Sequence, residues 1–423
     1  MPATRVAADT AGAGTPPAHD LLALTLRDDR GRLLAALAYR LGSIQRAEDA
    51  LQEACISALQ HWGRDGAPHS PRGWLIRVAL RKALDQLRHE GRSAERESAM
   101  QLLNDLLGQD EPDPIPDERL RLIFTCCHPA LELKSRVALT LRTVCGLSTG
   151  EIARLFLDNE PAMAQRLSRV RRKIAQAGIA YAVPAPEQWA DRLQAVLTTV
   201  YLIFTTGYTM APADARDLCT EALFLIGLLC DLCPGQAEIE GAWALMLLTD
   251  ARRAARTGPD GATVPPAQQD RRLWNPDQLC RGQQLLQTAL LRRQAGPFQV
   301  KAAISACQMA EPGPDWPQML ALYTVLLGME PTPVVQVNHA VALAETGQVA
   351  AALGVLTGLR DTLDDFQPFH AAHAAVLARS GDSAAARHAY EKALALACNA
   401  GDRLFLAERM RQLPARPIAG QRA

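Results

Sequence analysis

The sequence lacks several features that would point directly to a class of protein. Its 45 Lys and Arg residues balance 45 Asp and Glu residues, so no overall charge directs it to nucleic acid or to a membrane surface. Aromatic residues make up only 5% of the 423 residues, and β-branched runs are rare beside abundant Ala and Leu, which favours helices over strands. The chain also has no apolar run long enough to span a bilayer and no apolar segment typical of a secretory signal. We therefore expect an all-α, cytoplasmic protein of two or three domains that makes no membrane contact.

The ten cysteines form no disulfide framework, and most lie among Leu and Ala at helical spacing, as reduced core thiols do. Cys230 and Cys233 have the CxxC spacing of redox and zinc sites. Because no second CxxC, His pair or βαβ pattern accompanies them, we interpret them as core cysteines at a helix end.

The segment "IFTCCHPALE" also contains residues that bind metals or act as nucleophiles. Cys126, Cys127 and His128 are consecutive, so on a helix they point in different directions and cannot converge on one metal without distant partners. We interpret the segment as a packed helix junction, with Pro129 in the first turn of the next helix and His128 near its N-cap; a catalytic cysteine is the alternative. We predict no metal, no cofactor and no enzymatic activity.

Composition changes along the chain predict its domain boundaries. Helical periodicity is interrupted by polar, acidic and proline-containing stretches, of which "DEPDPIPD" is the clearest. The predicted parts are a disordered tail at 1–19, a helical unit at 20–92, an acidic linker at 93–116, a second helical unit at 117–183, a helical extension at 184–412 and a tail at 413–423.

The second helical unit contains a helix-turn-helix pattern. In "LSTGEIARLF", Ser148 and Glu151 have the spacing of a capping box, and Leu147 and Ile152 that of a hydrophobic staple. A short helix is expected there, followed by a turn in which Asn159 caps the longer basic helix "EPAMAQRLSRVRRKIAQAG". A short helix, a tight turn and a basic helix are typical of DNA-binding proteins.

The basic helix is the candidate recognition helix. Gln165 and Arg166 lie in its N-terminal half, and both residue types make bidentate contacts with base edges. Arg169, Arg172 and Lys173 are better placed for phosphates, which supply affinity rather than sequence reading. The alternative is a solvated basic face.

A second basic strip lies on the helix expected at residues 72–92. An aromatic ring beside cations is typical of a surface for strand-separated DNA, because bases stack on the ring and cations hold the backbone. A tryptophan such as Trp74, however, more often lies in a core. The candidate DNA-binding residues of this strip are Trp74, Arg77, Lys82 and Arg88.

An acidic face precedes that strip, in "AEDALQEA". Asp49 and Glu53 have i,i+4 spacing on one side of a helix, beside Glu48 and Gln52. They are an acid/base pair, metal ligands, or a solvated or partner-binding face; we favour the last because no histidine lies nearby.

The C-terminal part repeats itself every 34 residues, which is the period of the tetratricopeptide repeat (TPR). Small residues would let paired helices approach, and a glycine would form the turn between them. The matched pairs are Ala340 with Ala374, Leu343 with Leu377, Gly347 with Gly381, Ala352 with Ala386 and Leu356 with Tyr390. We predict a TPR-like α-solenoid in the extension, with a looser third copy at 301–331.

Together these motifs resemble a bacterial RNA polymerase sigma factor of the extracytoplasmic-function (ECF) type, in the subgroup with a TPR-like C-terminal extension. "AEDALQEA" and "WLIRVALRKALDQLR" resemble sigma region 2. "IPDERLRLIFTCCHPALELKSRVALTLRTVCGLSTGEIARLFL" and "MAQRLSRVRRKIAQAGI" resemble region 4 of that subgroup, and "ALMLLTDARRAAR" resembles part of its extension.

The resemblance implies two partners, core RNA polymerase and promoter DNA, and a possible peptide or protein ligand of the extension. Asp49, Gln52 and Glu53 would contact the polymerase clamp. The residues of the 72–92 strip would read the minus-ten element, and Gln165, Arg166 and Arg169 the minus-thirty-five element.

Three positions depart from the family pattern. Leu80-Arg81 stands where Arg-Asn is usual, "LDNEPA" makes the turn before the recognition helix acidic, and Thr205-Thr206 replaces part of a usual "NEG". The departure at Leu80-Arg81 motivates the alternative function, a TPR-type interaction regulator whose sigma-like half no longer opens promoters.

Overall fold

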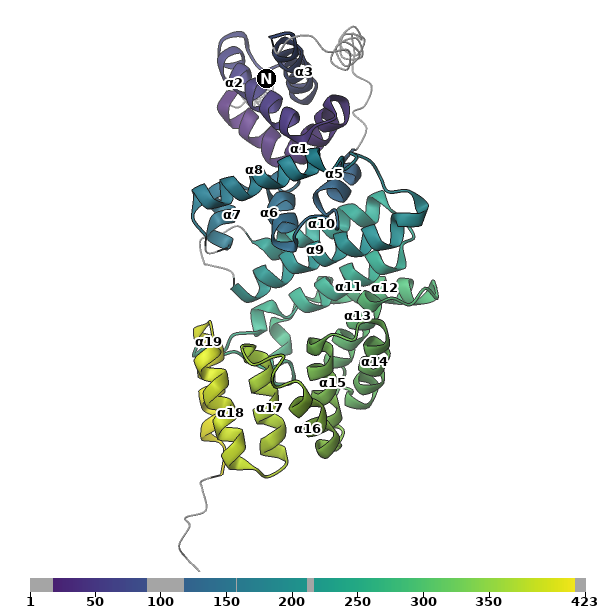
Figure 1. The fold of residues 1–423 in the computed structure, drawn as a ribbon, viewed down its shortest axis with the longest axis vertical. Coiled ribbons are helices and arrows are strands. Elements are labelled where there is room, and N and C mark those ends of the chain that lie inside the picture. The colour runs from purple at the N-terminus through teal and green to yellow at the C-terminus, as the bar shows by residue number, and fades with distance from the viewer. Residues whose placement is uncertain (1–17, 90–117, 157, 211–216, 415–423) are drawn as a thin grey trace, which may run out of the picture. The chain divides into compact units, whose positions relative to one another are not determined.

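The computed structural model describes residues 18–89, 118–156, 158–210 and 217–414, and nearly all of these are helical or in turns (Figure 1). Within these ranges the only β-structure is one isolated bridge, between Thr257 and Thr263. The all-α prediction is therefore confirmed. The predicted linker and most of both predicted tails lie outside the described residues. No helix in the described ranges is long and apolar enough to cross a membrane.

The chain divides into two compact units, residues 1–199 and 200–423. The first begins with α1 (Ala18–Leu41), α2 (Ile44–Asp65) and α3 (Pro71–His89). Leucines from all three helices are at most 2% exposed and form their core: Leu33, Leu34, Leu37, Leu51, Leu75 and Leu80. The α2 helix ends at Asp65, and the loop after it begins at Gly66, where φ is 88°.

Four shorter helices follow in the first unit: α5 (Arg119–Cys126), α6 (Leu133–Thr143), α7 (Thr149–Leu155) and α8 (Glu160–Gln176). The amide of Glu151 donates to Ser148 Oγ at 3.1 Å, and the amide of Ser148 donates to the Glu151 carboxylate at 2.7 Å, so the capping box is present. The Ala162 amide donates to Asn159 Oδ1 at 2.8 Å and caps α8. The predicted short helix, turn and longer basic helix are confirmed.

The junction between α5 and α6 differs in detail from the prediction. Pro129 lies in a separate turn, closed by the Leu131 amide donating to the His128 carbonyl at 2.9 Å, and α6 begins only at Leu133. His128 Nδ1 accepts from the Ala130 amide at 3.1 Å, so it caps this turn rather than the helix. The sequence prediction was wrong here because proline suits a tight turn as well as a first helical turn.

The second unit is a succession of helices, and the boundary between the units falls within α9 (Trp189–Met210), which follows the 3₁₀ turn η1 (Pro186–Gln188). The helices after α9 are α10 (Leu218–Leu232), α11 (Ala237–Asp250), α12 (Pro276–Leu291), α13 (Pro297–Gln308), α14 (Trp316–Met329), α15 (Pro333–Glu345), α16 (Val349–Gly358), α17 (Gln367–Arg379), α18 (Ser383–Leu396) and α19 (Ala400–Arg411). Three 3₁₀ turns lie between α11 and α12: η2 (Arg253–Ala255), η3 (Pro266–Gln268) and η4 (Arg271–Leu273).

Two helix pairs, α15 with α16 and α17 with α18, repeat one another (Figure 1). Gly347 and Gly381 occupy the two inter-helix turns with φ of 89° and 88°, a region where glycine costs least. The matched alanines of the sequence repeat, Ala340 with Ala374 and Ala352 with Ala386, are all fully buried. The 34-residue periodicity is thus structural, and the assignment of these pairs to the TPR class stays a prediction.

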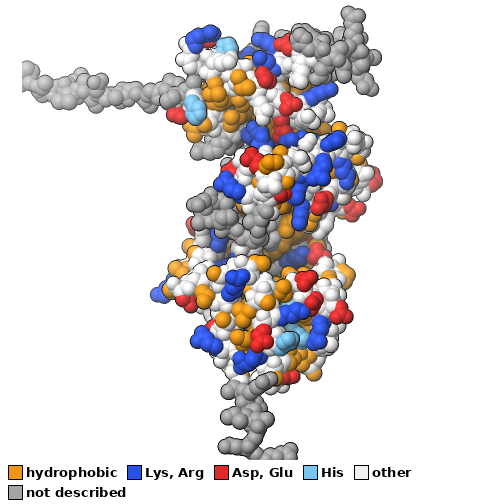
Figure 2. All heavy atoms as spheres, turned by 60° about the vertical axis from the view of Figure 1, so that its left-hand side comes forward, with side chains coloured by type: hydrophobic (Ala, Val, Ile, Leu, Met, Phe, Trp, Pro, Cys, Tyr) orange, Lys and Arg blue, Asp and Glu red, His pale blue; other side chains and the backbone are white. Residues whose placement is uncertain are grey.

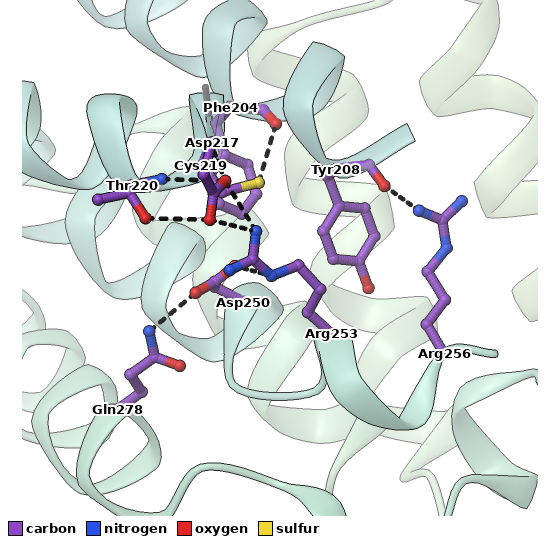
Figure 3. A network of polar contacts seen from close by, with 9 residues as sticks. All are labelled: Phe204, Tyr208, Asp217, Cys219, Thr220, Asp250, Arg253, Arg256 and Gln278. Carbon is purple, nitrogen blue, oxygen red and sulfur yellow. Dashed lines mark hydrogen bonds and ion pairs between the residues drawn. The ribbon is translucent and has the colours of Figure 1, made fainter. Parts of the chain in front are cut away.

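A polar network fixes the start of the second unit (Figure 3). Arg253 donates to both carboxylate oxygens of Asp217 at 2.8 Å and lies 3.1 Å from Asp250, which accepts from Gln278 at 2.8 Å. Asp217 also caps α10 by accepting from the amide of Cys219. Burial alone would raise the pKa of Asp217, but the Arg253 guanidinium holds it below its ordinary value. The network therefore ties the turn after α11 to α10 and α12.

Candidate nucleic-acid interface

The α8 helix has one buried side and one cationic side. Met163, Leu167 and Val170 are at most 6% exposed and face the core of the first unit. The exposed side carries four of the five predicted DNA-binding residues of this helix: Gln165, Arg169, Arg172 and Lys173. This arrangement leaves their donors free to meet a ligand that approaches α8 from solvent.

The fifth predicted residue, Arg166, is half-buried and already has partners. Its Nη2 lies 3.2 Å from an oxygen of Asp158, and its guanidinium lies 5.9 Å from the centre of the Phe156 ring. Asp158, in the acidic turn before α8, thus neutralises Arg166. To contact a base, the Arg166 guanidinium must leave Asp158 and bond an acceptor on the base edge instead.

Arg171 belongs to the same basic run but faces the opposite way. Its Nη2 lies 2.5 Å from the Glu48 carboxylate on α2, and the two side chains are 18% and 9% exposed. This ion pair removes Arg171 from the cationic side of α8. Sequence spacing alone gave no indication of it, because the partners are far apart in the chain.

A cleft of about 330 Å³ runs beside α8. Its lining includes the predicted Arg166, Arg169 and Lys173 together with Lys134 and Ser135 from α6, which the sequence analysis missed. Figure 2 shows Lys and Arg side chains gathered at the level where Figure 1 places α6 to α8. The cleft therefore offers cations from two helices to one ligand.

The α3 helix presents a second, smaller basic surface. Arg77, Arg81 and Lys82 are exposed on it, whereas the side chain of Arg88 lies outside the described residues. Trp74 is half-buried and packs edge-on against Trp62, with ring centroids 5.4 Å apart. Its ring is thus held in place by the core while part of it remains accessible.

Leu80, one of the positions that depart from the family pattern, lies in the core and not on the surface. Leu80 is 2% exposed, so it packs inside the three-helix core and contacts no external ligand. Arg81 beside it is exposed and keeps a cation on the surface.

The acidic face predicted on α2 is exposed, and it also contains apolar residues. Asp49, Gln52 and Glu53 are exposed, while Ile56 and Leu59 on the same side are 51% and 49% exposed. Ile56 lies four residues after Gln52 and three after Glu53, and Leu59 lies three residues after Ile56, so this helical spacing could have revealed both in the sequence. A helix side that combines carboxylates with two large apolar residues is typical of a protein-binding surface.

Comparisons with known proteins give these surfaces a family context. The family "Sigma-70 region 2" matches residues 26–93, and "Sigma-70, region 4" matches residues 121–174. The chain contains both sigma-70 regions. A family of unknown function, DUF6596, matches residues 192–290. The resemblance of both helical units to sigma-70 regions is thereby confirmed, and the TPR-like subgroup stays a prediction.

The chain is also similar to individual known proteins. The chain is 36% identical over 410 residues to the "Uncharacterized protein R00370" of Rhizobium meliloti (strain 1021), which covers 93% of this chain and 96% of that protein. The two proteins belong to one family. The chain is also 30% identical over 181 residues to the "Probable ECF RNA polymerase sigma factor SigI" of Mycobacterium tuberculosis (strain CDC 1551 / Oshkosh), covering 41% of this chain and 61% of that protein.

A further relative is the "ECF RNA polymerase sigma factor SigJ" of Mycobacterium tuberculosis (strain ATCC 25618 / H37Rv), 30% identical over 164 residues. That alignment covers 36% of this chain and 50% of the relative, so it spans about half of the length of that sigma factor. No solved structure is significantly similar to the chain.

The sigma-70 region 4 of this chain contains the Cys126–Cys127 pair, and both thiols are fully buried. Cys126 Sγ lies 3.1 Å from Thr143 Oγ1, and Cys127 Sγ lies 3.5 Å from Thr140 Oγ1. Burial raises the pKa of both thiols above its ordinary value and so disfavours the reactive thiolate form. Within the described ranges, no group of three or more His, Cys, Asp or Glu residues could hold a metal ion.

We expect brief alkylation of the folded protein with iodoacetamide to modify Cys280 and Cys398 and to spare Cys126 and Cys127. The first two are exposed, whereas the thiols of sigma-70 region 4 are buried and protonated. Peptide mass spectrometry after quenching would measure the modified fraction at each cysteine. Preferential modification of Cys127 would support a nucleophilic role instead.

Proposed function

We propose that the chain is a sigma factor of the ECF type, which binds core RNA polymerase and directs it to specific promoters. The observation that carries the proposal is the capped helix-turn-helix whose α8 exposes Gln165, Arg169, Arg172 and Lys173, within a chain that also contains a sigma-70 region 2. The factor needs no catalytic group or cofactor of its own.

The two basic surfaces read two promoter elements in this proposal. Gln165, Arg166 and Arg169 contact the minus-thirty-five element from the major groove, and Arg172 and Lys173 contact phosphates. On α3, Arg77, Lys82 and Arg88 hold the backbone at the minus-ten element, and Trp74 stacks on an unpaired base. The accessible but anchored Trp74 ring supports this role, since stacking needs a rigid aromatic surface.

The exposed side of α2 binds the polymerase. Asp49, Gln52 and Glu53 supply polar contacts, and Ile56 and Leu59 supply the apolar centre that stable protein interfaces have.

The helix pairs of the second unit form a regulatory or docking module for a peptide or protein ligand.

Transcription in vitro with core RNA polymerase tests the proposal. Genomic fragments serve as templates, and start sites are mapped by sequencing the transcripts. The protein is expected to produce transcripts from a defined set of promoters that core polymerase alone does not use. Polymerase binding without open-complex formation on any fragment would favour the alternative, an interaction regulator that no longer opens promoters.

Replacing Arg166 by alanine is expected to weaken binding selectively at the preferred minus-thirty-five sequence. A bidentate base contact accounts for about 1–3 kcal/mol of discrimination, and the side chain must leave Asp158 to make it. Fluorescence anisotropy of the polymerase complex on matched and scrambled duplexes would measure the difference. Arg172→Ala on the same helix is the control, and it should weaken both duplexes equally; the same behaviour from Arg166→Ala would reassign Arg166 to phosphate.

A further inference from the structure

The second unit contains a cavity of about 370 Å³ that the proposed sigma-factor surfaces do not use. Residues of α9, α11, α13, α14 and α15 line it, together with the turn after α11 and the segment before α15. Sites for small molecules have volumes of about 300–1,000 Å³. Much of the wall is apolar: Leu245, Ile304, Leu326, Val334 and Val335.

Arg252 lies in this wall with an incompletely bonded guanidinium. The residue is 5% exposed, and its Nη1 is buried without a hydrogen-bond partner. The other guanidinium contacts are weak: Nε lies 3.4 Å from the Leu248 carbonyl, and Nη2 lies 3.3 Å from Gln308 Oε1. In the residues that the structure describes, no carboxylate forms an ion pair with Arg252. Burial lowers its pKa below the ordinary value, but an arginine remains charged at neutral pH.

A second unbonded group, the Ser305 hydroxyl, lines the same cavity. Ser305 is 4% exposed, and its Oγ has no partner among the described residues. Tyr201 and Tyr323 also line the cavity, and burial raises the pKa of both, that of Tyr323 to about 12. Both phenols therefore stay protonated at neutral pH and can donate hydrogen bonds.

The balance of charge in the cavity wall is positive. Lys301 is neutralised by Glu330, whose carboxylate lies 2.7 Å from its ammonium, and this leaves Arg252 as the uncompensated charge among the lining residues. A buried charge without a counter-ion is costly, so an anion that pairs with Arg252 and bonds Ser305 would be stabilised here. One guanidinium balances one negative charge, which matches a monocarboxylate better than a phosphate dianion.

The position of Arg252 is fixed before any ligand arrives. Its neighbour Arg253 is tied to Asp217 and Asp250, and Asp250 is held in turn by Gln278 (Figure 3). These contacts hold the turn that carries both arginines. A guanidinium that is already positioned loses little conformational entropy on binding.

We infer that this cavity binds a small organic molecule that has one carboxylate and an apolar body. Arg252 and Ser305 bind the carboxylate, and the leucine, isoleucine and valine walls contain the body. Ligand binding does not depend on sigma-factor activity. Only an effect of the ligand on transcription would rest on the proposed function.

Isothermal titration calorimetry of the full chain tests the inference without polymerase. The probes are 3-phenylpropionate and octanoate, each compared with its neutral primary amide. At least one carboxylate is expected to bind saturably with one-to-one stoichiometry and at least tenfold more tightly than its amide. Absence of binding by both carboxylates, or equal binding of acid and amide, would overturn the inference.

Two variants and a control locate the site. Arg252→Gln is expected to weaken carboxylate binding at least tenfold, whereas Arg360→Gln, at an exposed arginine of the same unit, should not change it. Ser305→Leu removes the hydroxyl and places an apolar side chain in the cavity without removing the charge. It should weaken carboxylate binding at least tenfold, which tests the site even if Arg252→Gln does not fold. Unchanged carboxylate binding by folded Ser305→Leu would show that the probe binds elsewhere.

Discussion

Replacing Ile56 by glutamate is expected to weaken binding to core RNA polymerase by roughly 30-fold or more. Ile56 is 51% exposed between the carboxylates of α2 and Leu59, at the centre of the proposed polymerase-binding surface. A buried apolar anchor at the centre of an interface commonly contributes about 2 kcal/mol or more, and a charge there must be desolvated as well. Biolayer interferometry with immobilised core enzyme would measure the dissociation constant.

The matched control for Ile56→Glu is Leu404→Glu on α19. Leu404 is 48% exposed, so both substitutions place a carboxylate at a similarly exposed leucine or isoleucine position, but only one lies on the α2 surface. The control should bind core polymerase as the unaltered chain does. If Ile56→Glu binds equally well, the polymerase contacts another surface and the role proposed for Asp49, Gln52 and Glu53 falls with it.

Replacing Arg171 by alanine is expected to destabilise the first unit by about 3–5 kcal/mol, because it leaves the Glu48 carboxylate buried without its counter-ion. Glu48 already has one carboxylate oxygen, Oε1, without a hydrogen-bond partner, so the guanidinium is its main compensation. Urea unfolding of the full chain, followed by circular dichroism, would show the earliest transition moving to lower urea concentration.

A double variant separates the cost of an unpaired Glu48 carboxylate from the contribution of the ion pair itself. Glu48→Leu with Arg171→Met replaces both charges by apolar groups of similar size, and such replacements are often neutral or stabilising. We therefore expect the double variant to recover most of the stability that Arg171→Ala loses. Equal destabilisation by both would mean that the ion pair itself supports the fold, because the double variant keeps an apolar side chain at position 171 and leaves no unpaired charge.

The parts of the fold that the sequence predicted correctly depend on neighbouring residues. The capping box of Ser148 and Glu151 and the cap at Asn159 involve residues three positions apart, so their spacing is visible in the sequence. The recurrence of glycine at positions 347 and 381 is equally visible in the sequence, because each repeat has a glycine in the turn between its two helices.

Other features could not be predicted from the sequence, because they depend on residues far apart in the chain or on patterns that suit more than one structure. Arg171 and Arg172 are adjacent cations, yet one is paired with Glu48 and the other is exposed, and only the packing of α8 decides between them. Residues from five helices line the cavity around Arg252, so no local sequence pattern predicts it. The turn at His128 and Pro129 was wrong because proline is equally favourable in two kinds of structure.

The Glu48–Arg171 pair joins α2 and α8, the helices that carry two of the proposed binding surfaces. Glu48 adjoins Asp49, which is proposed to bind polymerase, and Arg171 lies on the back of α8, which is proposed to present Arg169 to DNA. If a ligand that binds one helix weakens this ion pair, it also changes the binding free energy of a ligand on the other helix. By thermodynamic linkage, the factor by which polymerase alters DNA affinity through this pair must equal the factor by which DNA alters polymerase affinity.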